Sequence, residues 1–238
     1  MDYCWVHGAE KTLRTILRPA RHVQIIMFEH LLRFDKSKTI VLWDFETLNL
    51  CLHACHNLPW QLAMMKVKGN DIVDFKDYLI KWDTKLTISD GAARITRYSQ
   101  DKMDKFGLPP EEVYPVMKQW FDEADFLMGH NVIGFDIHLV FHWCRMNGDD
   151  PRPYVKKLID TNLLAKGLKL EVPLKTTDNL LEYQYKLYHK KVKGVRTNLT
   201  ALGKEYEIEH DYDNLHNARV DLELNKKVWD KLKFQIEI

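Results

Sequence analysis

The sequence is short of the features that mark secreted, membrane or disulfide-rich proteins. Only four of its 238 residues are cysteines, too few to suggest a disulfide scaffold in a chain of this length. No apolar run is long enough to span a bilayer, and the N-terminus lacks the apolar core of a signal peptide. We therefore expect a reduced, cytoplasmic protein without a membrane partner, located in the host cytoplasm if the gene is viral.

An excess of charge of one sign is also missing, because the net charge is only +1. The chain as a whole therefore has no general attraction to nucleic acid or to a membrane surface, and any such attraction must come from local patches. The length fits one large domain or a domain with an appendage. We predict an N-terminal helical appendage over residues 1–37 and a main domain over residues 38–238.

Three segments have both a binding and a purely structural interpretation. The spacing over 8–36 predicts basic helices whose arginine stripe is a solvated face, with a phosphate contact as the alternative. Residues 51–56 contain two cysteines and two histidines, but they lack two separated ligand pairs, so a loop is preferred over a zinc site. Residues 185–196 form a predicted basic loop with tyrosines, where a surface that tracks a nucleic-acid strand and a solvated loop are equally supported.

Apolar periodicity predicts an α/β sandwich with a mixed sheet. Three strands come first, and short strands then alternate with helices. Strands are predicted over 39–46, 60–67, 72–82, 126–129 and 158–161. Helices are predicted over 111–124, 136–147, 161–166, 199–206 and 214–233, and residues 84–108 are a polar connector.

The first predicted strand ends in two carboxylates, Asp44 and Glu46. Because residues i and i+2 of a strand point to the same face, the two side chains project together. Adjacent carboxylates repel unless a cation or a shared proton neutralises them, and hard cations such as Mg²⁺ or Mn²⁺ prefer oxygen ligands. Taken alone, this pair is a weak signal, since acidic residues are common near turns.

Three more polar side chains strengthen the signal. Asp136 lies near the start of a predicted helix, and His216 and Asp221 are five residues apart on the last predicted helix. Both of these can reach a site over the N-terminal half of that helix. Each residue alone would be a surface or capping residue, but their combination with the strand pair indicates one site.

The motifs in this order resemble the DEDDh branch of the DnaQ-like 3′→5′ exonucleases. That group includes the proofreading epsilon subunit of bacterial DNA polymerase III and ribonuclease T. The matching motifs are Asp-x-Glu-Thr at 44–47, Gly-His-Asn-x4-Asp at 129–136 and His-x-Ala-x-x-Asp at 216–221. Thr47-Leu48-Asn49 departs from the usual Thr-Thr-Gly, and residues 1–37 have no counterpart in the family. The resemblance implies a ribonuclease H-like three-layer sandwich with a mixed five-stranded sheet.

The resemblance also implies the roles of the site residues. Four carboxylates would hold two divalent cations, Mg²⁺ or Mn²⁺, and a histidine would act as the general base. These catalytic residues are Asp44, Glu46, Asp136, Asp221 and His216. The expected substrate-binding residues are Thr47, Leu48, His130, Asn131 and Phe135, with Lys190, Lys191 and Arg196 from the basic loop. A core role for Phe135 is equally supported. Asp160 is expected to cap the next helix rather than to bind metal.

The expected substrate is a nucleic acid with a free 3′ end. Single-stranded or frayed DNA is preferred, either in degradation or in proofreading, and proofreading would connect the chain to a DNA polymerase or replication protein. Trimming of RNA is the alternative, because the sequence does not show which residue contacts a 2′-hydroxyl. A catalytically silent binding or polymerase-anchoring module is a third interpretation, and the full set of acidic residues and histidine argues against it.

Overall fold

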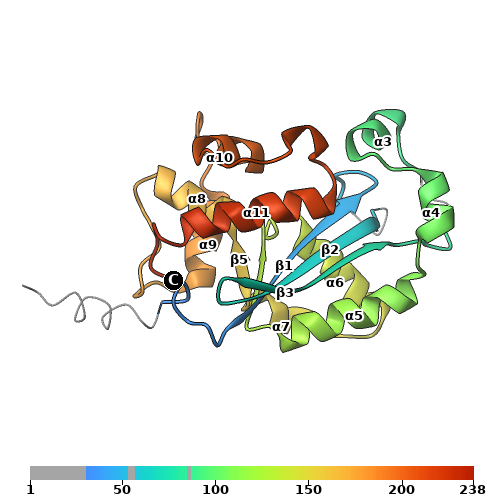
Figure 1. Cartoon of the computed structure of the whole chain (residues 1–238). Helices are drawn as coiled ribbons and strands as arrows, with labels where there is room; N and C mark the ends of the chain where they lie inside the picture. Colours follow the sequence, from blue (N-terminus) through green and yellow to red (C-terminus); the bar gives the residue numbers. More distant parts are fainter. Residues whose placement is uncertain (1–30, 53–56, 85–86) are drawn as a thin grey trace, which may run out of the picture.

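The computed structural model describes residues 31–52, 57–84 and 87–238. They form a five-stranded sheet between two layers of helices (Figure 1). The strand order β3-β2-β1-β4-β5 places the strand of Asp44 and Glu46 in the middle. The predicted mixed sheet and ribonuclease H-like sandwich are therefore confirmed.

The appendage and the cysteine–histidine segment are only partly described. Residues 1–30 and 53–56 lie outside the described residues. Residues 31–36 form turns, so the helix predicted as far as residue 36 is wrong there. Arg33 Nη1 donates to the carbonyl oxygens of Lys233 and Ile236 at 3.1 and 3.2 Å, which fastens this segment to the C-terminal end of the chain.

The two halves of the sheet have different strand directions. The antiparallel half contains β1 (Thr39–Thr47), β2 (Pro59–Lys68) and β3 (Asp71–Leu79). The turn between β2 and β3 contains Gly69 at a φ of 62°, a conformation that glycine adopts without strain. The parallel half adds β4 (Phe126–Gly129) and β5 (Leu158–Asp160) beside β1.

Helices cover both faces of the sheet, so β1 is apolar toward both. One layer contains α5 (Pro110–Glu123), α6 (Asp136–Met146) and α7 (Arg152–Val155). The other contains α8 (Thr161–Lys169), α9 (Leu180–His189), α10 (Leu199–Glu205) and α11 (Ala218–Leu232).

The side chains of β1 alternate between these two layers. Trp43 and Phe45 pack in the core that includes residues of α5 and α6, whereas Ile40 and Leu42 pack in the core that includes residues of α11. Asp44 and Glu46 continue the second set, because alternate residues of a strand share a face. The two carboxylates therefore face the layer that contains α11.

The predicted polar connector 84–108 contains two short helices. They are α3 (Asp90–Thr96) and α4 (Gln100–Phe106). Each is capped by a serine hydroxyl: Ser89 accepts from the Ala92 N–H and Ser99 from the Lys102 N–H. Met103 of α4 packs in a small third core with Leu48 and Trp60. This core holds the end of β1 against the inserted helices.

Two predicted boundaries near the site are wrong. Helix α9 extends to His189, so the first part of the predicted basic loop 185–196 is helical and only 190–196 is loop. Helix α11 begins at Ala218, and a 3₁₀ turn, η1 (Tyr212–Asn214), precedes it. His216 therefore lies in the connecting segment and not on the helix, because Asn217 is the residue that caps α11.

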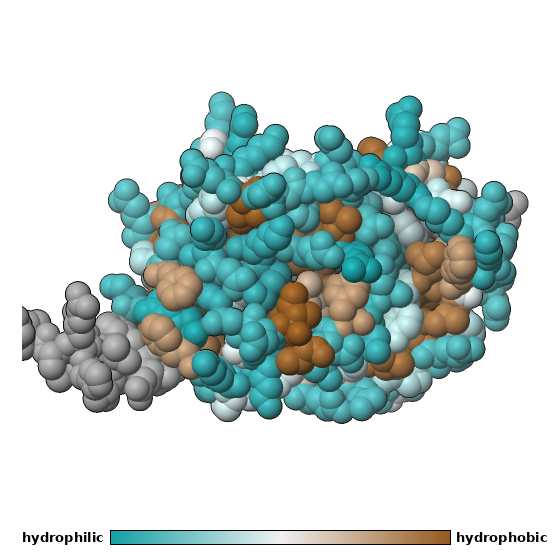
Figure 2. Space-filling model, in the orientation of Figure 1, coloured by the Kyte–Doolittle hydropathy of each residue, from teal (hydrophilic) through white to brown (hydrophobic). Residues whose placement is uncertain are grey.

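Within the described ranges, no helix combines the length and the apolar character needed to cross a membrane. The face shown in Figure 2 is mostly hydrophilic and includes hydrophobic residues near the edge strand β3. On that strand Ile72 and Val73 are 55% and 54% exposed. Charged neighbours such as Asp71 and Asp74 oppose the pairing of this edge with another strand.

Candidate active site

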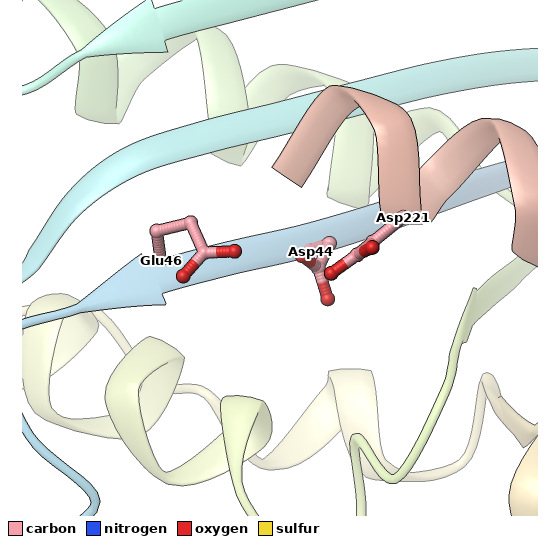
Figure 3. A group of neighbouring side chains, drawn as sticks. All are labelled: Asp44, Glu46 and Asp221. Carbon is pink, nitrogen blue, oxygen red and sulfur yellow. The ribbon is translucent and has the colours of Figure 1, made fainter. Parts of the chain in front are cut away.

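Three carboxylates meet between β1 and α11. Asp44 and Glu46 project from the same face of β1, and Asp221 lies in the first turn of α11 above that face. Their nearest carboxylate oxygens all lie within 4.8 Å of one another. Figure 3 shows Asp221 directed toward Asp44, with Glu46 farther along the strand. The pleat of β1 and the position of α11 thus bring together three of the four predicted metal ligands.

The fourth predicted ligand, Asp136, approaches from the opposite helical layer. It is the first residue of α6 and is only 4% exposed. Its Oδ1 accepts a hydrogen bond from the N–H of Phe45 at 3.3 Å, so this carboxylate is directed toward the backbone of β1. Asp136 lines the same cavity as the other three, but its oxygens lie outside their 4.8 Å group.

Burial and mutual repulsion raise the pKa values of the carboxyl groups in this cluster. Burial, together with Asp136, Asp221 and Glu46, raises the pKa of Asp44 well above its usual range. Burial and the neighbouring Asp221 and Asp136 raise the pKa of Glu46 to about 8. Burial also raises the pKa of Asp136 to about 7 and that of Asp221 to about 6. Such a group favours either protons or bound cations.

His216 is attached directly to this cluster. Its backbone N–H donates to both carboxylate oxygens of Asp221 at 3.3 Å. The residue has a φ of 65°, the left-handed conformation, which turns the chain so that this N–H faces the first turn of α11. The histidine is exposed and lines the cavity above the carboxylates.

The carboxylates lie in a cavity of about 900 Å³. Five predicted substrate-binding residues line it: Thr47, Leu48, His130, Asn131 and Phe135. The side chain of Leu48 is nevertheless only 5% exposed, because it also packs in the third core. Thr47 donates its hydroxyl to the carbonyl oxygen of Asn49 at 2.7 Å, which shapes the loop after β1.

Sequence reasoning missed one whole wall of the cavity. Ala92, Ile95 and Thr96 of α3 line it, as do Asn49, Leu50, Asn162 and Asn198. A serine followed by helix-forming residues occurs at both 89 and 99, and this helix-start signal could have revealed α3 and α4. The position of α3 over the cavity is set by tertiary packing and has no comparable signal.

The segment that follows β4 is organised by a buried carboxylate. Asp160 accepts from the N–H groups of Asn131, Ile133 and Asn162 at 3.0 Å and of Leu163 at 3.3 Å. The structure thus agrees with its expected role as a helix cap and adds a hold on the loop that bears Asn131. Burial raises the pKa of this carboxyl to about 6.

His130 is held in the same region. Its Nδ1 lies 3.0 Å from the hydroxyl of Thr161, and its Nε2 lies 3.3 Å from the side-chain amide of Asn162. Burial lowers the pKa of this imidazole to about 4, so it is neutral at physiological pH. These contacts make His130 a support of the cavity wall as well as one of its lining residues.

The basic residues of the predicted loop lie outside the cavity lining. Lys190, Lys191 and Arg196 are exposed in the segment between α9 and α10. The Nζ of Lys169 donates to the carbonyl oxygen of Arg196 at 2.5 Å, and the segment then reaches Asn198 at the cavity. The loop therefore leads from the surface to the site.

The structure thus combines a ribonuclease H-like sandwich with an acidic cavity at the end of its central strand. A sequence model of the RNase T exonuclease family matches residues 41–229. The chain belongs to this family, so the resemblance to DnaQ-like exonucleases is confirmed.

The chain is also similar to parts of larger proteins. It is 25% identical over 203 residues to the PolC-type DNA polymerase III of Mycoplasma pneumoniae and 26% identical over 201 residues to that of Mycoplasma genitalium. These matches cover 85% and 84% of the chain but only 12% of each polymerase. The chain thus spans about an eighth of the length of these relatives.

Solved structures of E. coli exonuclease I share the fold. The complex with a dT13 oligonucleotide has a TM-score of 0.63 and 17% identity over 83% of this chain and 41% of that chain. The zinc-bound complex with single-stranded DNA has a TM-score of 0.66 and 17% identity over 84% and 41% of the two chains.

Proposed function

We propose that this protein removes 5′-mononucleotides from the 3′ end of nucleic acid, with single-stranded or frayed DNA as the preferred substrate. The observation that carries this proposal is the convergence of three carboxylates within 4.8 Å in a cavity of about 900 Å³. The acidic group suits metal-assisted hydrolysis, and the polar and apolar walls leave room for a nucleotide.

The donor set fits divalent cations. Every candidate ligand is a carboxylate oxygen, which Mg²⁺ and Mn²⁺ prefer, and raised pKa values of the carboxyls indicate a group that a cation would relieve. Asp44, Glu46 and Asp221 would hold two such ions, with Asp136 as the fourth ligand. Bound ions of this kind supply a nucleophilic water and stabilise the charge on the leaving oxygen.

The residues of the chain then complete the reaction. His216 takes the proton of the attacking water and the water oxygen forms a bond to phosphorus. The bond from phosphorus to the 3′-oxygen breaks, and that oxygen takes a proton from solvent to become the new 3′-hydroxyl. The hydrogen bonds from the His216 N–H to Asp221 keep the base beside the carboxylates. Asn131 and the backbone near Thr47 position the last nucleotide, and Phe135 packs on its base or sugar.

DNA is favoured over RNA by the relatives. The two Mycoplasma relatives are DNA polymerases, and the E. coli exonuclease I structures contain DNA oligonucleotides. A polymerase or replication protein is the corresponding partner, and Lys190, Lys191 and Arg196 would follow the strand that leaves the site. Trimming of RNA is the alternative, and a silent binding module is the third.

The test uses 5′-end-labelled single-stranded and duplex DNA and RNA, incubated with Mg²⁺, Mn²⁺ or chelator. We expect a ladder that shortens from the 3′ end, fastest on single-stranded DNA, and no cleavage in chelator. Asp44→Ala should abolish cleavage, whereas Asp150→Ala, at an exposed carboxylate outside the cavity lining, should not. Faster cleavage of RNA would favour the alternative, and binding without cleavage under every condition would favour the silent module.

A further inference from the structure

Arg97 connects the missed wall of the cavity to the segment that carries the histidine. Its guanidinium donates to the side-chain oxygen of Asn214 through Nη1 and to the carbonyl oxygen of Asp213 through Nη2. His216 follows two residues after Asn214. In Figure 1, α3 lies beside the segment that connects α10 to α11. These elements are more than a hundred residues apart in sequence.

We propose that Arg97 is a positioning residue that sets the placement of His216 for the reaction. This inference rests on the proposed function, because it concerns the same hydrolysis. It assigns a role to α3, which belongs to none of the motifs that suggested the site.

The α3 side of this connection is fixed by the helix end. Arg97 directly follows α3 as its C-cap and has a φ of 58°. A residue other than glycine adopts this left-handed conformation only where its surroundings favour it. Ile95 and Thr96, the two preceding residues, line the cavity. The guanidinium is therefore tied through the backbone to the wall that faces the substrate.

The histidine side of the connection is a turn that touches the core only through the half-buried Tyr212 and Leu215. Asn214 donates its side-chain amide to the carboxylate of Asp211, which closes the turn of η1, and none of the three residues of η1 is buried. His216 itself is exposed and reaches the cluster through its backbone N–H. Packing fixes Tyr212 and Leu215, but the polar residues Asp213 and Asn214 between them are held by directional hydrogen bonds, and Arg97 supplies two of these from outside the segment.

A guanidinium suits this task because it is planar and presents several donors in a fixed arrangement. It holds two acceptors at once and so defines the orientation of the turn as well as its distance from α3. A lysine would supply a single point contact. Small displacements of a catalytic group can lower a rate by about 10²-fold, so a surface contact of modest strength can matter greatly for turnover.

The first experiment compares single-turnover and steady-state cleavage of single-stranded DNA by Arg97→Ala, Arg97→Lys and the wild type. Arg97→Ala should lower kcat about tenfold or more while KM changes less than about threefold. Arg97→Lys should recover only part of kcat, and added guanidinium ion, compared with equal sodium chloride, should restore Arg97→Ala. The matched control is Arg94→Ala, since Arg94 is an exposed arginine of the same helix outside the cavity lining.

A double-variant cycle tests the contact itself. Asn214→Ala should lower kcat in the same direction, and Arg97→Ala/Asn214→Ala should be no slower than Arg97→Ala alone, because the shared interaction is already lost. Thermal melting of each variant identifies any that fails to fold. A kcat for Arg97→Ala within twofold of wild type, or fully additive losses in the double variant, would overturn the proposal.

A measurement without turnover separates this inference from the proposed function. The imidazole NMR signals of the wild type, assigned by comparison with His216→Ala, should broaden or shift at His216 in Arg97→Ala and stay unchanged in Arg94→Ala. Unchanged His216 signals in Arg97→Ala would contradict the positioning role even if the protein cleaved no substrate. If the wild type cleaves no nucleic acid but the signals change, the proposed function fails and the structural connection stands.

Discussion

Two loops line the cavity that contains the carboxylates, one with Asn131 and one with His216, and different kinds of contact hold them in place. Asn131 in one and His216 in the other both have a φ of 65°. The Asn131 loop is held by the N–H groups of Asn131 and Ile133, which donate to the fully buried Asp160 together with two N–H groups at the start of α8. The His216 loop is anchored by the half-buried Tyr212 and Leu215, and its polar residues are held by the exposed Arg97 and by long N–H bonds to Asp221 at 3.3 Å.

The contrast shows how one site combines rigid and adjustable parts. Buried hydrogen bonds to a carboxylate are strong and leave large penalties when broken, so the Asn131 loop is part of the folded core. Exposed contacts contribute little to global stability, so the His216 loop can move at little expense to the fold. We infer that the nucleotide-positioning side is preorganised, whereas the side of the general base is set by surface contacts.

The largest effect is expected from a substitution in the His216 loop, and it should lower activity without changing stability. His216→Ala should lower kcat by about 10²–10⁴-fold, because a positioned base is removed. The melting temperature should change little, because the side chain is exposed. Single-turnover cleavage and thermal melting measure the two quantities, with His138→Ala on the exposed face of α6 as the control. A rate within twofold of wild type would remove His216 from the mechanism.

The rigid loop should show the reverse pattern. Asp160→Ala leaves four N–H groups without their acceptor, and three of these bonds have a length of 3.0 Å. We expect a loss of about 3 kcal/mol or more in the free energy of unfolding, measured by urea titration. If the loss is below about 1 kcal/mol, comparable to that of an exposed pair, then the two loops are not held differently.

The sequence predicted the rigid part of this comparison far better than the adjustable part. Asp44 and Glu46 follow from strand periodicity, and Asp160 was correctly expected to cap α8. The spacing between His216 and Asp221 predicts that both lie on one helix, whereas in the structure the helix begins only after its cap Asn217. The helix begins after Asn217 because an asparagine side chain caps the first N–H groups of a helix, and this preference outweighs the near-helical spacing of His216 and Asp221.

The contacts between distant segments had no signal in the sequence. Arg97 and Asn214 are 117 residues apart, and neither belongs to a recognisable motif. The residues on either side of α3, Ile88 and Tyr98, pack against Leu48, Trp60 and Met103, a tertiary arrangement that local propensity does not encode. Similarly, α9 extends to His189, so residues 185–189 of the expected basic loop are helical.

The smallest expected effect concerns the charge that both loops surround. In the folded protein the pKa values of Glu46, Asp136 and Asp221 are about 8, 7 and 6, all above their usual values. The folded state therefore holds protons that the unfolded chain has already lost near pH 4. The stability linked to these protons is present at low pH and is lost as the pH rises through about 6 to 8.

Asp136→Asn tests this directly, because it removes one charge and leaves an oxygen that can accept from the Phe45 N–H. In chelator, wild type should melt lower at pH 8.5 than at pH 6, and Asp136→Asn should melt a few degrees above wild type at pH 8.5. Mg²⁺ should raise the melting temperature of wild type by binding only the folded site, and the variant should lose most of that gain and nearly all activity.

The control is Asp150→Asn, where a hydrogen bond from the Arg152 side chain and the Arg152 N–H lower the pKa of the carboxyl. A carboxyl of this kind favours the folded state when ionised, so its amide should not raise the melting temperature at pH 8.5. If Asp136→Asn melts below wild type in chelator and keeps the full Mg²⁺ gain, Asp136 is a structural partner of β1. The rigid loop would then contribute shape to the site, and all of the metal ligands would lie on β1 and α11.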